Sequence, residues 1–249
     1  MIVLGIDTST NYGSIAITNK DNLLSESSIP SRDSYSKSLI GAVDELLERC
    51  KIEIGDIDGY AVSIGPGSFT GLRIGLSTCK GFHIATGRPV IPVDTLDAMA
   101  ENIISDSEFF DSELRTQNSE LLLCPIIDAK KEEVYTAFYK YKYGKIEKMT
   151  EERAVAPERH CREIDKPTIF FGDGLRTYGG FIKDRLKGLA FFYDDMSKTI
   201  ASSVAFIGAK KLERGDIENS DSLKPKYIRR SEAEIKWEEK EKMITAITK

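Results

Sequence analysis

The stretch IVLGIDTSTNYGSIAIT, residues 2–18, is typical of two strands joined by a short turn. Its first half is an apolar run that ends at the carboxylate of Asp7, and its second half, GSIAIT, is apolar again. Between them, Asn11 and Gly13 are residue types that tolerate the positive φ angles of hairpin turns. We therefore predict that the chain opens with a hairpin whose first strand is buried and ends at Asp7.

The residues that follow extend this hairpin into a larger unit. Apolar periodicity and turn residues predict five further elements, in the order strand, helix, strand, helix, strand, and then a closing helix. The strands are expected at 22–29, 59–65 and 87–94. The helices are expected at 36–50, from within the stretch 65–81 to about 86, and from 94 or 95 to 104. The predicted order of this first unit is βββαβαβα.

The same order returns after a polar, acidic segment at 104–119. The segment IIDAK at 126–130 corresponds to GIDTS at 5–9, and TIFFGDGLR at 168–176 corresponds to AVSIGPGSF at 61–69. Strands are expected at 121–130, 132–141, 144–155, 167–175 and 189–195, and helices at 177–186 and 199–215. We interpret this as an internal duplication of about 120 residues. Two such lobes, 1–105 and 106–249, indicate an α/β fold of the actin-like, ribonuclease-H-like superfold (ASKHA).

Composition excludes several classes of protein. The net charge of −5 argues against a chain that grips nucleic acid unaided, because such binding neutralises phosphates. Four scattered cysteines and two distant histidines predict no disulfide framework and no metal site, and they suit a reducing, cytoplasmic environment. The sequence has no apolar run of membrane-spanning length and no basic leader at its N-terminus, so we expect neither a membrane partner nor a signal peptide.

In this superfold a nucleotide usually lies between the lobes. Asp7, Thr8 and Ser9 could contact phosphate with their hydroxyls and amides, or Asp7 could simply bind local backbone. The second lobe has DAKKEEV (128–134) where a small, glycine-rich turn would be needed, whereas Gly172 and Gly174 retain a turn at which an adenosine could lie. We expect no required cofactor and no catalytic residue, and at most weak ADP or ATP binding in the cleft or at a complex interface.

The stretch GPGSFTGLRIGLSTCKG, residues 65–81, places glycines inside a predicted helix. It lacks the lysine of a phosphate-binding P-loop. Gly67, Gly71 and Gly75, followed by Cys79, recur every four residues and share one helix face. Each interior glycine costs about 1 kcal/mol relative to alanine, which close packing can offset. The partner of that face is either a neighbouring element of the same chain or a second chain.

These segments, together with DTST, DAKKEEVY and KPKYIRRSEAEIKW, resemble the TsaB (YeaZ) family over nearly the whole chain. The resemblance implies a bacterial accessory protein for threonylcarbamoyladenosine, the modified adenosine beside the anticodon of tRNAs that read ANN codons. It implies a non-catalytic paralogue that binds and activates the TsaD-type transferase, forms homodimers when alone, works with a TsaE-type ATPase and meets tRNA only within the complex. The implied interface combines the helix at 36–50 with Gly67, Phe69, Thr70, Gly71, Arg73, Ile74, Gly75 and Thr78, where Arg73 makes either a partner contact or an internal salt bridge.

Three further features bear on function. TsaD-like enzymes carry a metal-binding histidine pair after the third strand, whereas the corresponding segment here, SRDSYSKSL (31–39), has no histidine. The segment also lacks the R-x-H-S motif that many TsaB relatives carry there. Basic strips at 139–148 and 224–230 either face tRNA or solubilise edge strands. The charged tail from 231 is a packed helix, a frayed end or a partner contact. The alternative functions are a small-molecule kinase or phosphotransferase and, last, a peptidase, for which the sequence supplies no nucleophile–base pair.

Overall fold

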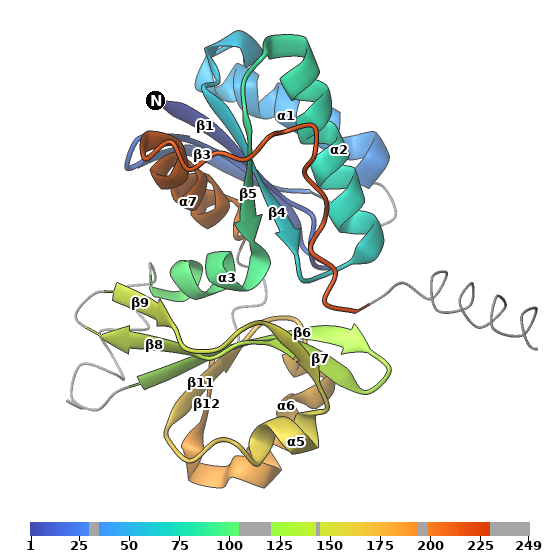
Figure 1. Cartoon of the computed structure of the whole chain (residues 1–249), viewed down its shortest axis with the longest axis vertical. Helices are drawn as coiled ribbons and strands as arrows, with labels where there is room; N and C mark the ends of the chain where they lie inside the picture. The colour runs from blue at the N-terminus through green and yellow to red at the C-terminus, as the bar shows by residue number, and fades with distance from the viewer. Residues whose placement is uncertain (30–34, 105–120, 143–144, 194–198, 230–249) are drawn as a thin grey trace, which may run out of the picture.

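The computed structural model describes residues 1–29, 35–104, 121–142, 145–193 and 199–229, and these form two lobes, each built on one sheet (Figure 1). The first sheet has the strand order β3-β2-β1-β4-β5. Strand β2 is antiparallel to β1 and β3, whereas β1, β4 and β5 are parallel to one another. The bounds are β1 Ile2–Asp7, β2 Gly13–Asn19, β3 Asn22–Ile29, β4 Gly59–Gly65 and β5 Val90–Asp94.

The opening hairpin is present, with Asp7 of β1 paired to Ser14 of β2. The expectation for its turn is wrong, because neither Asn11 nor Gly13 has a positive φ. The connection instead folds around a side chain: the amide of Ser9 donates to Asp7 Oδ1 over 3.1 Å. A carboxylate that accepts a hydrogen bond two residues onward holds such a turn without left-handed backbone.

The second sheet has the order β10-β7-β6-β11-β12, and β8 also pairs with β6 and β9. Two strands predicted as continuous, over 132–141 and 144–155, are each divided in two. Pro125 explains the first division, because β6 pairs with β7 from Ile126 onward and with β8 up to Leu123, and proline has no N–H to donate between them. The bounds are β6 Leu121–Lys130, β7 Glu133–Thr136, β8 Tyr139–Lys142, β9 Lys145–Lys148, β10 Arg153–Val155, β11 Thr168–Phe171 and β12 Ala190–Tyr193.

Each lobe thus carries an antiparallel hairpin on a parallel sheet, the actin-like, ribonuclease-H-like arrangement predicted from element order. The helices are α1 Tyr35–Cys50, α2 Phe69–Thr86, α3 Thr95–Ile104, α5 Pro157–Cys161, α6 Leu175–Leu186 and α7 Ala201–Glu213, with short 3-10 turns at Ile54–Asp56 and Lys187–Leu189. Among them no helix has both the length and the apolarity that a bilayer span requires.

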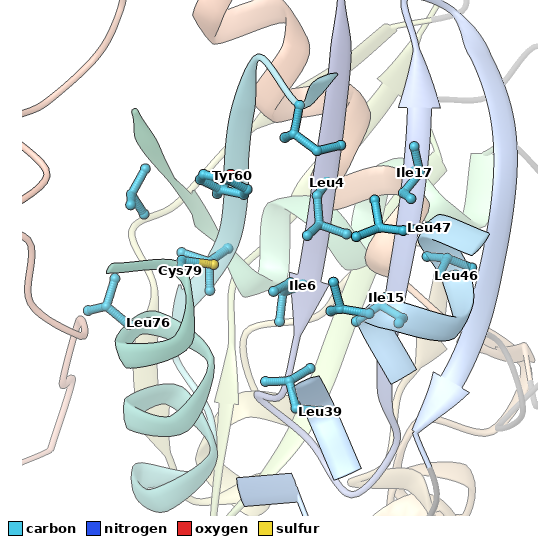
Figure 2. Close-up of a cluster of buried hydrophobic side chains, with 14 of the residues drawn as sticks. Leu4, Ile6, Ile15, Ile17, Leu39, Leu46, Leu47, Tyr60, Leu76 and Cys79 are labelled. Carbon is cyan, nitrogen blue, oxygen red and sulfur yellow. The ribbon is translucent and has the colours of Figure 1, made fainter. Parts of the chain in front are cut away.

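The first lobe has a core between its sheet and the pair α1 and α2. Figure 2 shows the apolar side chains of the hairpin facing those of the two helices. Alternation along the strands selects one face, because successive side chains of a strand point to opposite sides. The buried members include Leu4, Ile6, Ile15 and Ile17 from the strands, Leu39, Leu46 and Leu47 from α1, and Leu76 and Cys79 from α2.

Helix α7 covers the opposite face of this first sheet, although the sequence analysis assigned residues 201–213 to the second lobe. Its Val204 and Ala205 pack against Val3 and Ala61 in a separate cluster. Small residues make the approach possible, since a Cβ on Gly5 would lie 2.3 Å from the carbonyl oxygen of Ala201. The prediction failed because apolar periodicity shows that a helix has a buried face without showing which sheet buries it.

Helix α3 lies between the lobes rather than within the first. Leu96, Met99 and Ile103 pack in a cluster with Ile169 and Phe171 of the second sheet. Ala98, on another face of α3, belongs to the cluster beneath α7. The closing helix of each half of the chain therefore contacts the other half, which makes the two lobes structurally dependent on each other.

The chain then runs back along the first lobe through residues 219–229, which we call the C-terminal strap. Its Ser220 hydroxyl accepts a hydrogen bond from the amide of Val90 over 2.9 Å, and Leu223 is buried in the first core. The amide of Lys226 donates to the carbonyl oxygen of Ile64 over 2.7 Å. In Figure 1 the strap passes in front of β5 and α2 toward the second lobe.

We predict that Gly208→Leu destabilises the chain, because a Cβ at Gly208 of α7 would lie 2.4 Å from the Cβ of Ala61 in β4. Overpacking of this kind costs about 1–3 kcal/mol. The matched control is Gly180→Leu on α6, where a Cβ meets nothing within 4 Å and helix propensity favours leucine. Urea unfolding of both variants measures the difference, and equal stabilities would contradict the placement of α7.

Candidate functional site

A cavity lies where the two lobes meet, bounded by the opening hairpin, α3 and the end of β11. Its volume is about 60 Å³, against roughly 300–1,000 Å³ for pockets that hold small-molecule ligands. A nucleotide would therefore require the lobes to separate. The lining residues are Asp7, Thr10, Tyr12, Met99, Asn102, Ile103, Phe171, Gly172, Asp173, Tyr193 and Ile200.

Asp7 is fully buried at the wall of this cavity. Its Oδ1 accepts two hydrogen bonds from Ser9, from the amide over 3.1 Å and from the hydroxyl over 2.6 Å. Its Oδ2 has no hydrogen-bond partner within the described residues. Burial raises the pKa of Asp7, and the nearby carboxylate of Asp173 raises it further. The local hydrogen bonding that the sequence analysis held open is thus present.

Thr8 and Ser9, predicted as phosphate contacts, use their hydroxyls inside the protein. Both side chains are buried, and the Thr8 hydroxyl donates to the carbonyl oxygen of Gly71 over 2.7 Å. The Ser9 carbonyl oxygen accepts from the amide of Ser68 over 2.6 Å. The loop after β1 is therefore joined to the start of α2, and a role in binding phosphate stays a prediction.

The glycine turn at 172–174 has a structural reason. Gly172 has a φ of +107°, and a Cβ there would lie 2.6 Å from the carbonyl oxygen of Ile126. The amide of Gly174 donates to that same oxygen over 2.9 Å. Between them, Asp173 accepts from the amide of Asp128 over 3.3 Å and, across the cleft, from the side chain of Asn11 over 3.2 Å. The turn thus packs on β6 and joins the two hairpins.

The turn of the second lobe closes without glycine. Lys130, Lys131 and Glu132 all have φ between +52° and +61°. The ammonium group of Lys130 lies 2.7 Å from Asp128 Oδ2, and Arg229 donates to the carbonyl oxygen of Lys130 over 3.4 Å. The carboxylate at the end of the β6 core segment is therefore neutralised by its own turn. These residues do not form a phosphate cradle, which needs bare backbone amides.

The glycine face of α2 points inward, so the prediction that it admits a partner helix is wrong. A Cβ on Gly71 would lie 1.9 Å from the Thr8 carbonyl oxygen, one on Gly75 would lie 2.5 Å from the Thr8 hydroxyl, and one on Gly67 would lie 2.3 Å from the Ser9 carbonyl oxygen. The neighbour that requires the glycines is the loop after β1, which is the same-chain alternative of the sequence analysis.

Phe69 and Arg73, also predicted for the partner interface, pack against the C-terminal strap. The Phe69 ring stacks on Tyr227 with centroids 4.6 Å apart, and the Arg73 guanidinium lies 3.8 Å from the centroid of Phe69. Arg73 also donates to the Tyr227 hydroxyl over 2.8 Å. Among the residues that the structure describes, its internal partners are therefore aromatic, and none of them forms the salt bridge considered from sequence. The strap residue could not be identified from sequence because it is 154 positions away.

The outward face of α2 carries a different set of residues. Ser77, Gly81 and Ile84 are exposed there, Ile84 to 81%, together with the predicted Thr70. On the adjacent α1, Ile40 is 61% exposed and Gly41 has open space at its Cβ position, as Gly81 does. Ile74 and Thr78, also predicted, are half-buried at the edge of this face. Helical phase was the available signal, because at 100° per residue positions 70, 77, 81 and 84 cluster in one sector of the helix that differs from the sector of Gly71 and Gly75.

A cysteine–histidine contact in the second lobe was not predicted from the sequence. Cys124 Sγ lies 3.1 Å from His160 Nε2, and both side chains are buried. The Arg153 guanidinium lies 3.4 Å from His160 Nδ1 and can only donate, so Nδ1 accepts and the ring proton resides on Nε2. Burial raises the pKa of Cys124 to about 12. The histidine thus faces the thiol as a donor, which is the wrong arrangement for a base that activates a nucleophile.

Within the described residues one group of three carboxylates is close enough for a metal ion: Asp94, Asp97 and Glu152. Two lysines already occupy its centre. Lys148 lies 2.8 Å from Asp97 and 2.9 Å from Glu152, and Lys226 lies 2.9 Å from Asp94. This donor set is neutralised by protein cations and does not fit a metal.

Comparison with known proteins relates these features to a family. A family model for TsaD, tRNA N6-adenosine threonylcarbamoyltransferase, matches residues 24–237. The tRNA threonylcarbamoyladenosine biosynthesis protein TsaB of Bacillus subtilis strain 168 is 31% identical over 246 residues, which cover 97% of this chain and 100% of that protein. TsaB of Escherichia coli K12 is 26% identical over 94% of this chain and 96% of its own length.

A solved structure supports the fold. The structure of YeaZ from Pseudomonas aeruginosa superposes with a TM-score of 0.72 at 24% identity, and the match covers 91% of this chain and 99% of that one. The fold derived from strand order is therefore shared with that protein over nearly its whole length.

We predict that Gly71→Ala destabilises the isolated chain, since the new Cβ would collide with the backbone of Thr8. A clash with backbone cannot be relieved by a rotamer change, and we expect a loss of about 1–3 kcal/mol. Gly81→Ala, ten residues further along the same helix, meets open space and should gain up to about 1 kcal/mol. Thermal or urea unfolding gives the sign of each change, and a neutral Gly71→Ala would refute the inward orientation.

A pH-dependent loss of stability should trace to His160. Burial, reinforced by the charge of Arg153, lowers the pKa of His160 to about 4 from its usual 6.5. Its contribution is complete above pH 6.5 and is lost as pH falls toward 4, because the unfolded chain then binds a proton that the folded chain does not. Relative to His160→Gln, the wild type should lose roughly 3 kcal/mol across this window. Urea unfolding of both proteins across this pH range measures the difference. If their free energies of unfolding fell equally with pH, His160 would not be the cause.

Proposed function

Because the chain belongs to the TsaB family, we propose that it is a non-catalytic subunit in the biosynthesis of threonylcarbamoyladenosine in tRNA. In this proposal it binds a TsaD-type threonylcarbamoyl transferase and activates it, and the chemistry resides in that partner. A TsaE-type ATPase joins the assembly, and tRNA is met only within the complex. A second copy of the chain takes the place of the transferase when it is absent.

The observation that carries the proposal is the outward face of α1 and α2. Two large aliphatic side chains, Ile40 and Ile84, are 61% and 81% exposed on adjacent helices. Gly41 and Gly81, on these same two helices, have open space at their Cβ positions, so a partner backbone can approach each helix closely there. Two helices of a TsaD-type lobe of similar fold would complete a four-helix packing on this surface.

The non-catalytic part of the proposal has independent support in the cleft. A phosphotransferase of this superfold needs a free carboxylate and a phosphate turn in the second lobe, and here Lys130 lies 2.7 Å from Asp128. A peptidase needs an activated nucleophile, and the buried Cys124 faces a proton-bearing nitrogen of His160. Weak ADP or ATP binding stays a prediction that requires wider separation of the lobes.

The basic strips contribute little to a direct tRNA contact in this proposal. Lys148 and Lys226 are paired with the carboxylates of Asp94 and Glu152, and Arg229 lies 3.1 Å from Glu133. Cations that are engaged inside the molecule are not available to neutralise phosphates. The region around Arg32 and the tail from 231 lie outside the described residues.

The decisive experiment is a calorimetric titration that measures the affinity of this chain for the TsaD-type subunit from the same organism. We expect Ile84→Asp to weaken binding at least about tenfold, because it places a charge at the centre of an apolar contact. The matched control is Ile217→Asp, at a position that is 42% exposed and lies outside α1 and α2, which should bind like the wild type. Equal affinities for both variants would overturn the docking face.

Catalytic inactivity is tested separately. The chain alone should neither hydrolyse ATP nor transfer the threonylcarbamoyl group, whereas its addition should raise the activity of the transferase. ATP turnover by the chain alone, at a rate abolished by Asp7→Asn, would instead favour the phosphotransferase alternative.

A further inference from the structure

The C-terminal strap makes contacts with both lobes within a few residues. Lys226 donates its amide to Ile64 at the end of β4, and a Cβ on Gly65 would lie 2.4 Å from the Lys226 carbonyl oxygen. Tyr227 stacks on Phe69 of the first lobe. Three residues after Lys226, Arg229 donates to the carbonyl oxygens of the β6–β7 turn and pairs with Glu133 of the second lobe. The strap therefore crosses the junction between the lobes.

At this crossing the Lys226 side chain lies between carboxylates from the two lobes. Its ammonium group is 2.9 Å from Asp94 Oδ2, at the end of β5 in the first lobe. It is also 2.8 Å from Oε2 of Glu152, a residue that precedes β10 in the second lobe. This second contact is an ion pair rather than an aligned hydrogen bond. Lys148 completes the cluster by contacting Asp94, Asp97 and Glu152.

The charges of this cluster make Lys226 necessary for the approach of the lobes. Oxygens of Asp94, Asp97 and Glu152 lie within 4.8 Å of one another, and two ammonium groups offset all but one of the three negative charges. The Glu152 side chain is only 1% exposed, so solvent screens it poorly. Without Lys226, three carboxylates would face one cation, and Asp94 and Glu152 would repel each other across the junction.

We propose that the C-terminal strap is a clasp in which Lys226 holds the two lobes in their closed arrangement by neutralising Asp94 and Glu152 together. The clasp acts in the isolated chain and is independent of any partner on α1 and α2. Its release lets the lobes separate, which widens the cavity next to Asp7.

The test compares three variants. Lys226→Gln removes the bridging charge. Lys224→Gln, at an exposed position two residues earlier in the strap, is the matched control. Lys226→Gln with Glu152→Gln removes one charge of each sign, so two carboxylates again exceed the cations by one, as in the wild type. Circular dichroism checks that each variant is folded.

The readout is the distribution of distances between the lobes, from electron–electron double resonance on the full chain. Spin labels at Glu48→Cys on α1 and Lys183→Cys on α6, both exposed sites, report the separation in a Cys50→Ser background. We expect a narrow distribution for the wild type and Lys224→Gln, a broader one shifted to longer distances for Lys226→Gln, and recovery in the double variant.

Hydrogen exchange of the amide at residue 226 gives a second readout and should accelerate at least about tenfold in Lys226→Gln alone. A Lys226→Gln distribution that matches that of Lys224→Gln would overturn the clasp. So would a double variant that remains as broad as the single one, because charge would not then be the cause.

Discussion

The rest of the molecule depends on the contact between α2 and the loop after β1. Gly71 and Gly75 let the helix approach until a single added carbon would strike the backbone or hydroxyl of Thr8. That approach fixes the rotation of α2 about its axis, so the same contact that buries the glycines directs Ser77, Gly81 and Ile84 to solvent. It also seals the loop around Asp7, whose buried carboxylate forms one wall of the cavity. The buried glycine face and the exposed face of α2 are therefore two results of one steric constraint.

Much of this architecture could be predicted from the sequence, because local patterns determine it. Apolar runs and helical periodicity predicted the strands of the first sheet and the helices α1, α2 and α7, and Gly87 and Gly215 end α2 and α7 in left-handed conformations as helix-terminating glycines do. Three outcomes could not be predicted, since each depends on a contact distant in sequence. These are the packing of α7 on the first sheet, the stacking of Tyr227 on Phe69, and the engagement of Lys148 and Lys226 with the three carboxylates. The inward direction of the α2 glycines was one of two open alternatives, because a helix face of small residues does not identify its neighbour.

The two halves of the chain place a carboxylate at equivalent positions of the first strand but give it different partners. In the first lobe the carboxylate of Asp7 is held by Ser9, and the hairpin loop is tied to a helix. In the second, Asp128 is paired with Lys130, and the loop is tied to the strap through Arg229. Both carboxylates keep the position that the fold gives them at the end of the first strand, while their surroundings commit them to internal bonds. The two lobes thus share one architecture although the carboxylates at the ends of their first strands have different partners.

The placement of α7 and the strap has a consequence for biosynthesis. The first sheet lacks much of the apolar cover of one face until residues 201–213 have left the ribosome, because Val3 and Ala61 pack with Val204 and Ala205 of α7. Its edge at β5 is completed later still, when Ser220 binds the amide of Val90. The first lobe to be synthesised is therefore the last to be finished, and its nascent strands remain open to chaperones or to misassembly while the whole second lobe is translated.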